Sequence, residues 1–295
     1  MDTSSSPAVF VLDFDGTITT KDTISTLSKL AVEFQKSKGK DLTKALQDLV
    51  ARYHEDYSKH VAEYRPAGHE RRTLDEEIEY MRSLTAVELR SFGRVSASEI
   101  FRDIDVQDWP ELGREAVAGG EVKTRKGFQD FVAGIDKLGA IWGIVSANFS
   151  AYFIRSVLMA VGVDNGNVQV QANWPGNSGE LRGPHEGALI ATSEAKLGTT
   201  RELLKFWDAD NEYRDRTSKF VYIGDSGTDI ECLTADGAVG IVMSADGEGG
   251  LIETLKRVNV DVDHISKYEK RRGSSVYWAR DFEEILKSPL LNEAN

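Results

Sequence analysis

The 295-residue sequence contains a single cysteine, Cys232. One thiol excludes an internal disulfide framework and any zinc site built from several cysteines, so we expect a reducing compartment. The sequence also lacks an apolar run near the ~18 residues that a membrane span needs. The segment from Met1 to Pro7 is polar and has no signal-peptide core. We therefore expect a cytoplasmic protein with no membrane partner.

Positive charge is scarce as well. The chain has 36 Lys and Arg residues against 48 Asp and Glu residues, a formal net charge of -12. Its basic clusters, Arg71-Arg72 and Lys270-Arg271-Arg272, are short, and we interpret them as solvated surface. Because nucleic-acid binding needs a basic patch, a nucleic-acid partner is not expected. The length indicates about two domains.

The first chemical signal lies between Ala8 and Thr17. Five apolar residues, Ala8 to Leu12, predict a strand buried on both faces, as in a parallel sheet. Asp13 and Asp15 follow, and their spacing projects both carboxylates to one side of an extended chain. Two carboxylates this close repel each other unless a cation or a shared proton relieves them. An oxygen-rich site of this kind suits Mg²⁺.

Helical periodicity then dominates until about residue 120. Apolar residues from Leu42 to Tyr64 recur at three- and four-residue spacing, which predicts one long amphipathic helix. A second stripe, from Leu74 to Leu89, predicts another. We therefore expect residues 21–120 to form a helical cap domain, inserted after the first strand and covering the carboxylates. Three histidines fall here at spacings that share no helical face, so we expect no metal site from His54, His60 and His69.

Strands and helices alternate from residue 121 onward. Ala140–Val145, Phe220–Gly224 and Ala238–Met243 predict buried strands, with amphipathic helices between them. This alternation is typical of a parallel sheet with helices on both faces. The expected fold class is α/β, a Rossmann-like parallel sheet core made of residues 1–20 and 121–295, with the helical cap inserted.

Further polar residues follow two of these strands and begin a helix. Ser146 comes directly after Ala140–Val145, and the run from Gly224 to Asp229 ends the strand at Phe220. A helix is predicted from Ser193, its expected N-cap, with Lys196 in its first turn. Taken singly, Ser146 is interpreted as a capping residue and Lys196 as a solvent-facing one, whereas the run Gly224–Asp229 after an apolar strand already indicates a site. Because parallel strands end at one edge of a sheet, together they would supply what phosphoryl transfer requires.

At this point the sequence resembles the haloacid dehalogenase superfamily of phosphohydrolases. The four superfamily motifs correspond to Asp13–Thr17, Ser146, Lys196 and Gly224–Asp229. A helical cap between the first and second motifs is similar to the phosphoserine-phosphatase-like branch. The resemblance implies a phosphoric monoester hydrolase that depends on Mg²⁺. Its expected partner is a small phosphorylated metabolite, a phosphomonoester hydrolysed through an aspartyl-phosphate intermediate.

The resemblance also implies a role for each motif residue. Asp13 would be the nucleophile, Asp15 the general acid and base, and Lys196 the cation that neutralises phosphate and Asp13. Mg²⁺ would be held by Asp13, Asp225 and the backbone carbonyl of Asp15. The expected substrate-binding residues are Asp22, Ser146, Ala147 and Asn148, and the expected supporting residues are Thr17, Gly224 and Asp229.

Two positions depart from the phosphoserine-phosphatase pattern. Those enzymes usually carry Glu where this chain has Asp22, and a glycine pair where it has Ala147-Asn148. Both departures count against phosphoserine as the substrate. A phosphomutase of the same fold and a catalytically idle binding protein are the alternatives. An intact nucleophile, acid, lysine and metal aspartate favour an enzyme over the idle protein, while hydrolase and mutase share these residues.

Overall fold

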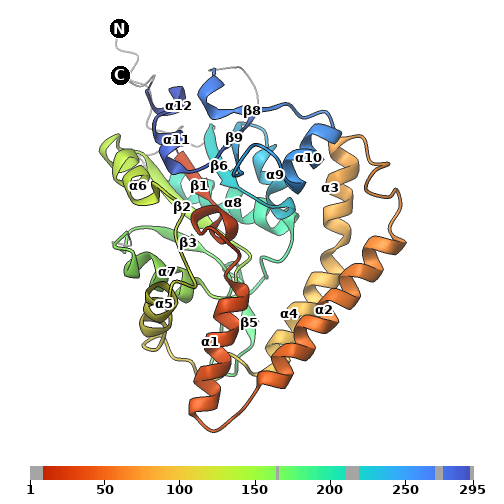
Figure 1. Cartoon of the computed structure of the whole chain (residues 1–295), viewed down its shortest axis with the longest axis vertical. Helices are drawn as coiled ribbons and strands as arrows, with labels where there is room; N and C mark the ends of the chain where they lie inside the picture. The colour runs from red at the N-terminus through yellow and green to blue at the C-terminus, as the bar shows by residue number, and fades with distance from the viewer. Residues whose placement is uncertain (1–8, 164–165, 210–218, 270–274, 293–295) are drawn as a thin grey trace.

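A seven-stranded parallel sheet lies at the centre of the chain (Figure 1). The computed structural model describes residues 9–163, 166–209, 219–269 and 275–292, so the Met1–Pro7 segment and the Lys270-Arg271-Arg272 cluster lie outside the described residues. This sheet confirms the expected α/β class. Its strands, in spatial order, are β3 (Gln169–Gln171), β2 (Ile141–Val145), β1 (Val9–Leu12), β6 (Phe220–Gly224), β7 (Ala238–Met243), β9 (Ser275–Ala279) and β8 (Val262–His264).

Strand β1 is buried on both faces, as its unbroken apolar sequence predicts. Phe10 and Leu12 pack into one hydrophobic cluster, whereas Val9 and Val11 pack into another on the opposite face. The first cluster is covered by α6 (Phe128–Lys137), α7 (Ala151–Ala160) and α11 (Phe282–Leu286). The second is covered by α8 (Ser193–Asp208), α9 (Ile230–Leu233) and α10 (Gly250–Arg257). The core therefore has three layers. Within the part of the chain that is described, no helix combines the length and apolar character needed to cross a membrane.

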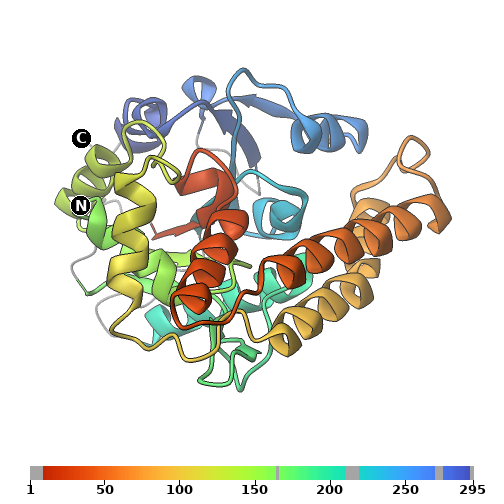
Figure 2. The same ribbon diagram turned by 60° about the horizontal axis from the view of Figure 1, so that its bottom comes forward.

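Five helices connect β1 to α6. They are α1 (Ile24–Ser37), α2 (Thr43–Glu63), α3 (Leu74–Ser83), α4 (Thr85–Ser98) and α5 (Trp109–Ala118). Figure 2 shows α2 and α4 side by side in an arm beside the core. The predicted long helix is α2, but the second stripe forms two helices instead of one. The break lies at Leu84, where the Thr85 hydroxyl donates to the Arg82 carbonyl at 2.6 Å.

The two chain segments that join the helical insert to the core run side by side. Thr19 and Thr124 form an antiparallel bridge. Next to them, the Thr20 amide donates to the Lys123 carbonyl at 2.9 Å. The last insert helix, α5, packs against α7 of the core so closely that a Cβ at Gly113 would lie 2.3 Å from the Ser156 Cβ. Helix α5 therefore packs as part of the core, although in the sequence it belongs to the insert.

Helix α3 is fastened to the core by ion pairs near both of its ends. Arg82 contacts the buried Glu231 carboxylate of α9 at 2.5 Å. At the other end, the buried carboxylate of Glu77 contacts Arg71 and Arg257 of α10, each at 2.7 Å. A two-stranded hairpin of β4 (Trp174–Pro175) and β5 (Leu181–Arg182) contacts α4. The ion pairs of Arg82 and Glu77 thus hold the helical insert to the core at both ends of α3. The remaining short elements are α12 (Pro289–Asn292) and the helical turns η1 (Phe14–Ile18), η2 (Gly227–Asp229) and η3 (Ile265–Lys267).

Candidate active site

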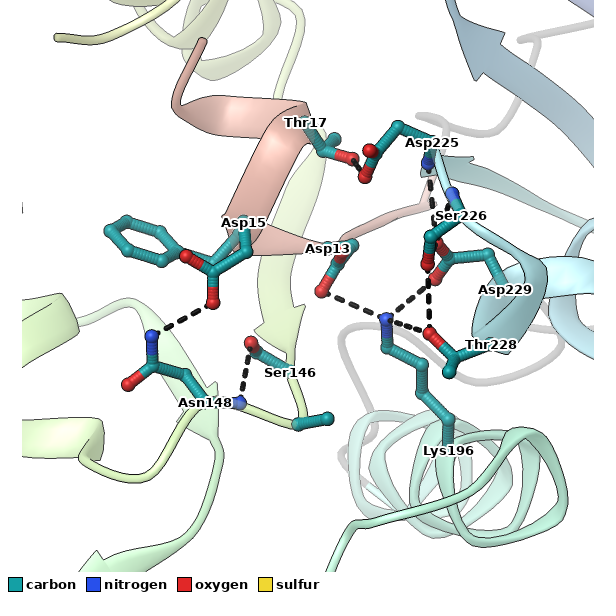
Figure 3. A network of polar contacts seen from close by, with 12 residues as sticks. Asp13, Asp15, Thr17, Ser146, Asn148, Lys196, Asp225, Ser226, Thr228 and Asp229 are labelled. Atoms are coloured by element: carbon teal, nitrogen blue, oxygen red, sulfur yellow. Dashed lines mark hydrogen bonds and ion pairs between the residues drawn. The ribbon is translucent and has the colours of Figure 1, made fainter. Parts of the chain in front are cut away.

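The turn after β1 lies at the centre of the site (Figure 3). The Asp13 amide donates to the carbonyl of Ile223 in β6 at 2.8 Å, which extends the sheet by one residue. Gly16 has a φ of +70, and a Cβ there would lie 2.1 Å from Asp225 Oδ2. Only glycine combines this backbone conformation with so close a neighbour. The turn therefore brings the first motif against Asp225 of the fourth.

Lys196 reaches from the first turn of α8 into a fully buried pair of carboxylates. Its Nζ lies 2.9 Å from Asp13 Oδ1 and 2.6 Å from Asp229 Oδ1. The Tyr222 hydroxyl also donates to Asp229 Oδ1 at 2.7 Å, and the Ser226 amide donates to Asp229 Oδ2 at 3.0 Å. Burial alone would lower the pKa of Lys196, but the two carboxylates outweigh it and raise that pKa. Asp229 therefore holds a charged lysine against Asp13.

Negative charge exceeds positive charge at this site. Carboxylate oxygens of Asp13, Asp225 and Asp229 lie within 4.8 Å of one another. Burial raises the pKa of Asp13 well above its ordinary value, and despite Lys196 the neighbouring carboxylates raise it further. Burial and Asp229 raise the pKa of Asp225 to about 7. Such shifts indicate a place where a cation would be stabilised.

The donor set fits Mg²⁺. Asp13 Oδ1 is buried and contacts Lys196 Nζ at 2.9 Å, but it accepts no well-aligned hydrogen bond from the described residues. Asp225 accepts one hydrogen bond, from the Thr17 hydroxyl at 3.0 Å on Oδ1. Both oxygens of Asp229, by contrast, already accept hydrogen bonds from protein groups. Oxygen ligands of this kind are those that Mg²⁺ prefers, so Asp13 and Asp225 are the side chains that could hold it.

Asp15 lies in a different environment from Asp13. Its Oδ1 accepts hydrogen bonds from the amide and hydroxyl of Thr23 at 2.7 and 2.6 Å. Its Oδ2 accepts one from the side-chain amide of Asn148 at 2.8 Å, and Figure 3 shows the carboxyl group turned toward that residue. Burial, followed by the nearby Asp22 carboxylate, raises the pKa of Asp15 to about 6. The two acids of the first motif thus differ in partners and in charge environment.

Asn148, expected to bind substrate, has its side chain engaged by protein groups. The side chain is fully buried. Besides Asp15, its Nδ2 donates to the Thr23 hydroxyl at 3.1 Å, while its Oδ1 accepts from the Ser150 amide at 3.0 Å. These contacts fix which end of the amide faces Asp15. The nearby Ser146 hydroxyl accepts a hydrogen bond from the backbone amide of Asn148 at 3.1 Å.

One cleft of about 910 Å³ joins the expected residues from all four motifs. Asp22 and Ala147 also line it. Gly224 lies behind it, where a Cβ would be 2.5 Å from Asp229 Cγ. The motif residues that line the cleft are Asp13, Asp15, Gly16, Ser146, Lys196, Asp225, Ser226 and Thr228.

A family model for haloacid dehalogenase-like hydrolases matches residues 10–234, most of the chain. The chain belongs to the haloacid dehalogenase-like hydrolase family. This confirms the resemblance and the hydrolase class inferred from the four motifs. Cold tolerance protein 1 of Saccharomyces cerevisiae is 23% identical over 282 residues, which cover 90% of this hydrolase and 88% of the yeast protein.

Solved structures share the fold of this hydrolase. A phospho-aspartyl intermediate analogue of phosphoserine phosphatase aligns with a TM-score of 0.51 and 15% identity, covering 96% of this chain and 99% of the other. Cytosolic 5'-nucleotidase IIIB bound to cytidine aligns with a TM-score of 0.55 and 16% identity, covering 98% and 87%. At these identities the similarity establishes a common fold.

Two residues that sequence reasoning missed also build the site of this hydrolase. The Arg125 guanidinium donates to the backbone carbonyls of Gly16 and Thr17, so it clamps the turn after β1. No motif marks Arg125. Tyr222, whose hydroxyl donates to Asp229, could have been found from the sequence, because it is the one residue with a hydroxyl in the otherwise apolar strand Phe220–Gly224.

One local prediction at helix α8 was wrong. The N-cap is Thr192, whose hydroxyl accepts a hydrogen bond from the Ala195 amide at 3.2 Å, and not Ser193. Ser193 instead donates to the buried Glu231 carboxylate at 2.8 Å. The helix therefore begins as expected within one residue, and the Ser193 hydroxyl makes a tertiary contact.

Proposed function

We propose that this hydrolase is a Mg²⁺-dependent phosphatase of a small phosphorylated metabolite in the cytoplasm, acting through an aspartyl-phosphate on Asp13. The observation that carries the proposal is the division between two acids in one cleft. Burial raises the pKa of both acids, but Asp13 faces the Lys196 ammonium at 2.9 Å and the carboxylate cluster where a bound cation would keep it ionised. Asp15 is held by neutral donors and has a pKa raised to about 6. Paired acids with such different environments are the usual signature of a nucleophile beside a proton donor.

In the first step, an Asp13 carboxylate oxygen attacks the phosphorus. The bond between phosphorus and the leaving-group oxygen breaks, and Asp15 gives its proton to that oxygen. A pKa near 6 keeps part of Asp15 protonated close to neutral pH, which suits a general acid. The solved structure of a phospho-aspartyl analogue of phosphoserine phosphatase, a protein with the same fold, supports an acyl-phosphate at this position.

In the second step, water attacks the phosphorus of the aspartyl-phosphate. Asp15, now a carboxylate, takes a proton from that water, and the bond between phosphorus and the Asp13 oxygen breaks. Inorganic phosphate leaves and both acids return to their starting states. A carboxylate nucleophile thus divides one difficult hydrolysis into two easier reactions.

Positive charge and hydrogen-bond donors stabilise the phosphoryl group in both steps. Lys196 offsets charge on Asp13 and on the phosphate. Ser146 and the following backbone amide would hold phosphate oxygens. Asp13, Asp225 and the backbone carbonyl of Asp15 would hold Mg²⁺, which when bound supplies charge that offsets the repulsion between two anions.

The helical insert is proposed as the cap, residues 21–120, over a core of residues 1–20 and 121–295. The paired segments at Thr19 and Thr124 support these limits, although α5 packs on the core. Asp22 lines the cleft where the chain enters the cap, which supports a place for it in the substrate shell.

Phosphate release from a panel of phosphorylated metabolites, measured with and without Mg²⁺, tests the proposal. The expected result is release that requires both Mg²⁺ and Asp13, with Asp13→Asn as the inactive control. Conversion of a substrate to its isomer without free phosphate would identify a phosphomutase instead. No turnover of any ester would support the idle binding protein.

A further inference from the structure

The cleft extends well beyond the reacting acids, and its far walls are apolar. Helices α1, α2 and α4 of the insert form these walls. At about 910 Å³ the cleft is far larger than a phosphoryl group and a serine need. Its apolar lining includes Leu46, Leu49, Val50, Phe92, Val95 and Ile100.

Helix α2 shows that this wall is not an ordinary core surface. All of its residues are described, and none of them is buried, although its sequence carries a long apolar stripe. Val50, which lines the cleft, remains 49% exposed. Leaving such side chains in water forgoes hydrophobic stabilisation, whereas an apolar ligand in the cleft would recover it.

The cleft offers little to a second charged group on a substrate. Among the described residues no arginine lines it. Lys196 is already paired with two carboxylates, and Lys29 and His54, which also line the cleft, are both exposed to solvent. The Glu88 carboxylate in the wall is bonded to the Tyr53 hydroxyl at 3.0 Å. A carboxylate or second phosphate on the leaving group would therefore find no buried arginine to pair with.

We propose that the substrate is a phosphomonoester whose leaving group carries a bulky, uncharged apolar body that fills the part of the cleft lined by α1, α2 and α4. The inference rests on the proposed phosphatase function, because the same cleft is lined by Asp13 and Lys196. The phosphoryl group lies against those residues, and the apolar body covers the exposed Val50 and the half-buried Leu46 and Leu49 of α2.

A series of straight-chain alkyl phosphates, from ethyl to octyl, tests the inference in the wild-type protein with Mg²⁺. Burying each methylene favours binding by about fourfold at most, so kcat/KM rises by about two- to fourfold per methylene until the cleft is filled. Phosphoserine should be a poorer substrate than hexyl phosphate. A flat or falling series, or a preference for phosphoserine, overturns the inference while leaving the phosphatase intact. Absence of release from every ester, p-nitrophenyl phosphate included, overturns the proposed function and this inference with it.

Two valines of α2 give a matched pair of variants. Val50 and Val61 are similarly exposed, at 49% and 46%, but only Val50 lines the cleft. Threonine keeps the shape of valine and adds a hydroxyl that must be desolvated. Val50→Thr should lower kcat/KM for octyl phosphate by about three- to tenfold, with a smaller effect on ethyl phosphate. Val61→Thr should change neither. Identical behaviour of the two variants would show that the α2 stripe does not contact the substrate.

Discussion

Replacing Asp15 by asparagine separates proton donation from geometry at this site. Three hydrogen bonds point at the Asp15 carboxylate, two from Thr23 and one from Asn148. An asparagine at position 15 can accept the two from Thr23, but its own NH₂ group then faces the NH₂ group of Asn148. Asn148 cannot reverse its amide without facing the Ser150 amide, another donor. The single variant therefore loses both the proton and one hydrogen bond.

The magnitude of each loss can be stated separately. General acid catalysis contributes ~10²–10⁴-fold, so Asp15→Asn should lower turnover of an alkyl phosphate by that factor. A buried donor without an acceptor costs about 1–3 kcal/mol, so the free energy of unfolding should fall by a similar amount. The double variant Asp15→Asn/Asn148→Asp restores a donor–acceptor pair in the reverse direction. It should recover stability without recovering turnover.

The assay compares hexyl phosphate with p-nitrophenyl phosphate. Nitrophenolate leaves without needing a proton, so Asp15→Asn should slow phosphorylation by this ester much less. Hydrolysis of the aspartyl-phosphate stays slow without a base, so a burst of nitrophenol should precede a low steady state. Equal losses in phosphorylation rate for both esters, with no burst, would refute the assignment of Asp15 as the acid. Recovery of turnover in the double variant would instead show that Asp15 acts by position.

Three further predictions concern other parts of the site and the cap. Asp13→Asn should abolish turnover. Beryllium fluoride with Mg²⁺ should raise the Tm of the wild type but not of this variant, and Tm shifts of similar size in the two proteins would contradict the assignment of Asp13 as the nucleophile. Gly16→Ala should weaken activation by Mg²⁺ at least tenfold, because the new Cβ meets the Asp225 carboxylate. Gly39→Ala serves as the control, because Gly39 also has a positive φ but a Cβ there would contact nothing within 4 Å. Glu77→Gln should lower the free energy of unfolding by about 3 kcal/mol in urea titrations because the buried Arg71 and the half-buried Arg257 lose their anion. Burial would raise the pKa of Glu77, but its arginine partners hold that pKa below the ordinary value. The stabilisation is therefore complete above about pH 4.3 and lost as the pH falls through the folded-state pKa; a variant that loses stability on acidification as steeply as the wild type would refute this.

The sequence identified most of the fold because its strands are signalled locally. An unbroken apolar run such as Val9–Leu12 predicts a strand buried on both faces, and the structure places its residues in two separate clusters. Strand β8 was missed because three residues, two of them polar, carry no such run. The split between α3 and α4 was missed because Leu84 is a good helix former and so gives no local signal of the break.

The residues that line the reacting end of the cleft were also predictable. Asp13, Ser146 and Asp225 each follow a strand directly, and parallel strands end at a common edge of the sheet. Sequence position therefore specifies which side chains meet there. Lys196 was found through the family motif, since most lysines in a helix face solvent.

The remaining features depend on which residues meet across long stretches of chain. The Arg125 clamp joins positions 108 and 109 residues apart, and the contact between Asn148 and Asp15 joins positions 133 apart. No local pattern encodes such partners. The stripe of α2 is the clearest case, because its periodicity gives an apolar face but not what that face contacts. Whether an amphipathic helix packs on a core or walls a cleft is decided only by the tertiary arrangement, since burial depends on neighbours that the helix's own sequence does not contain.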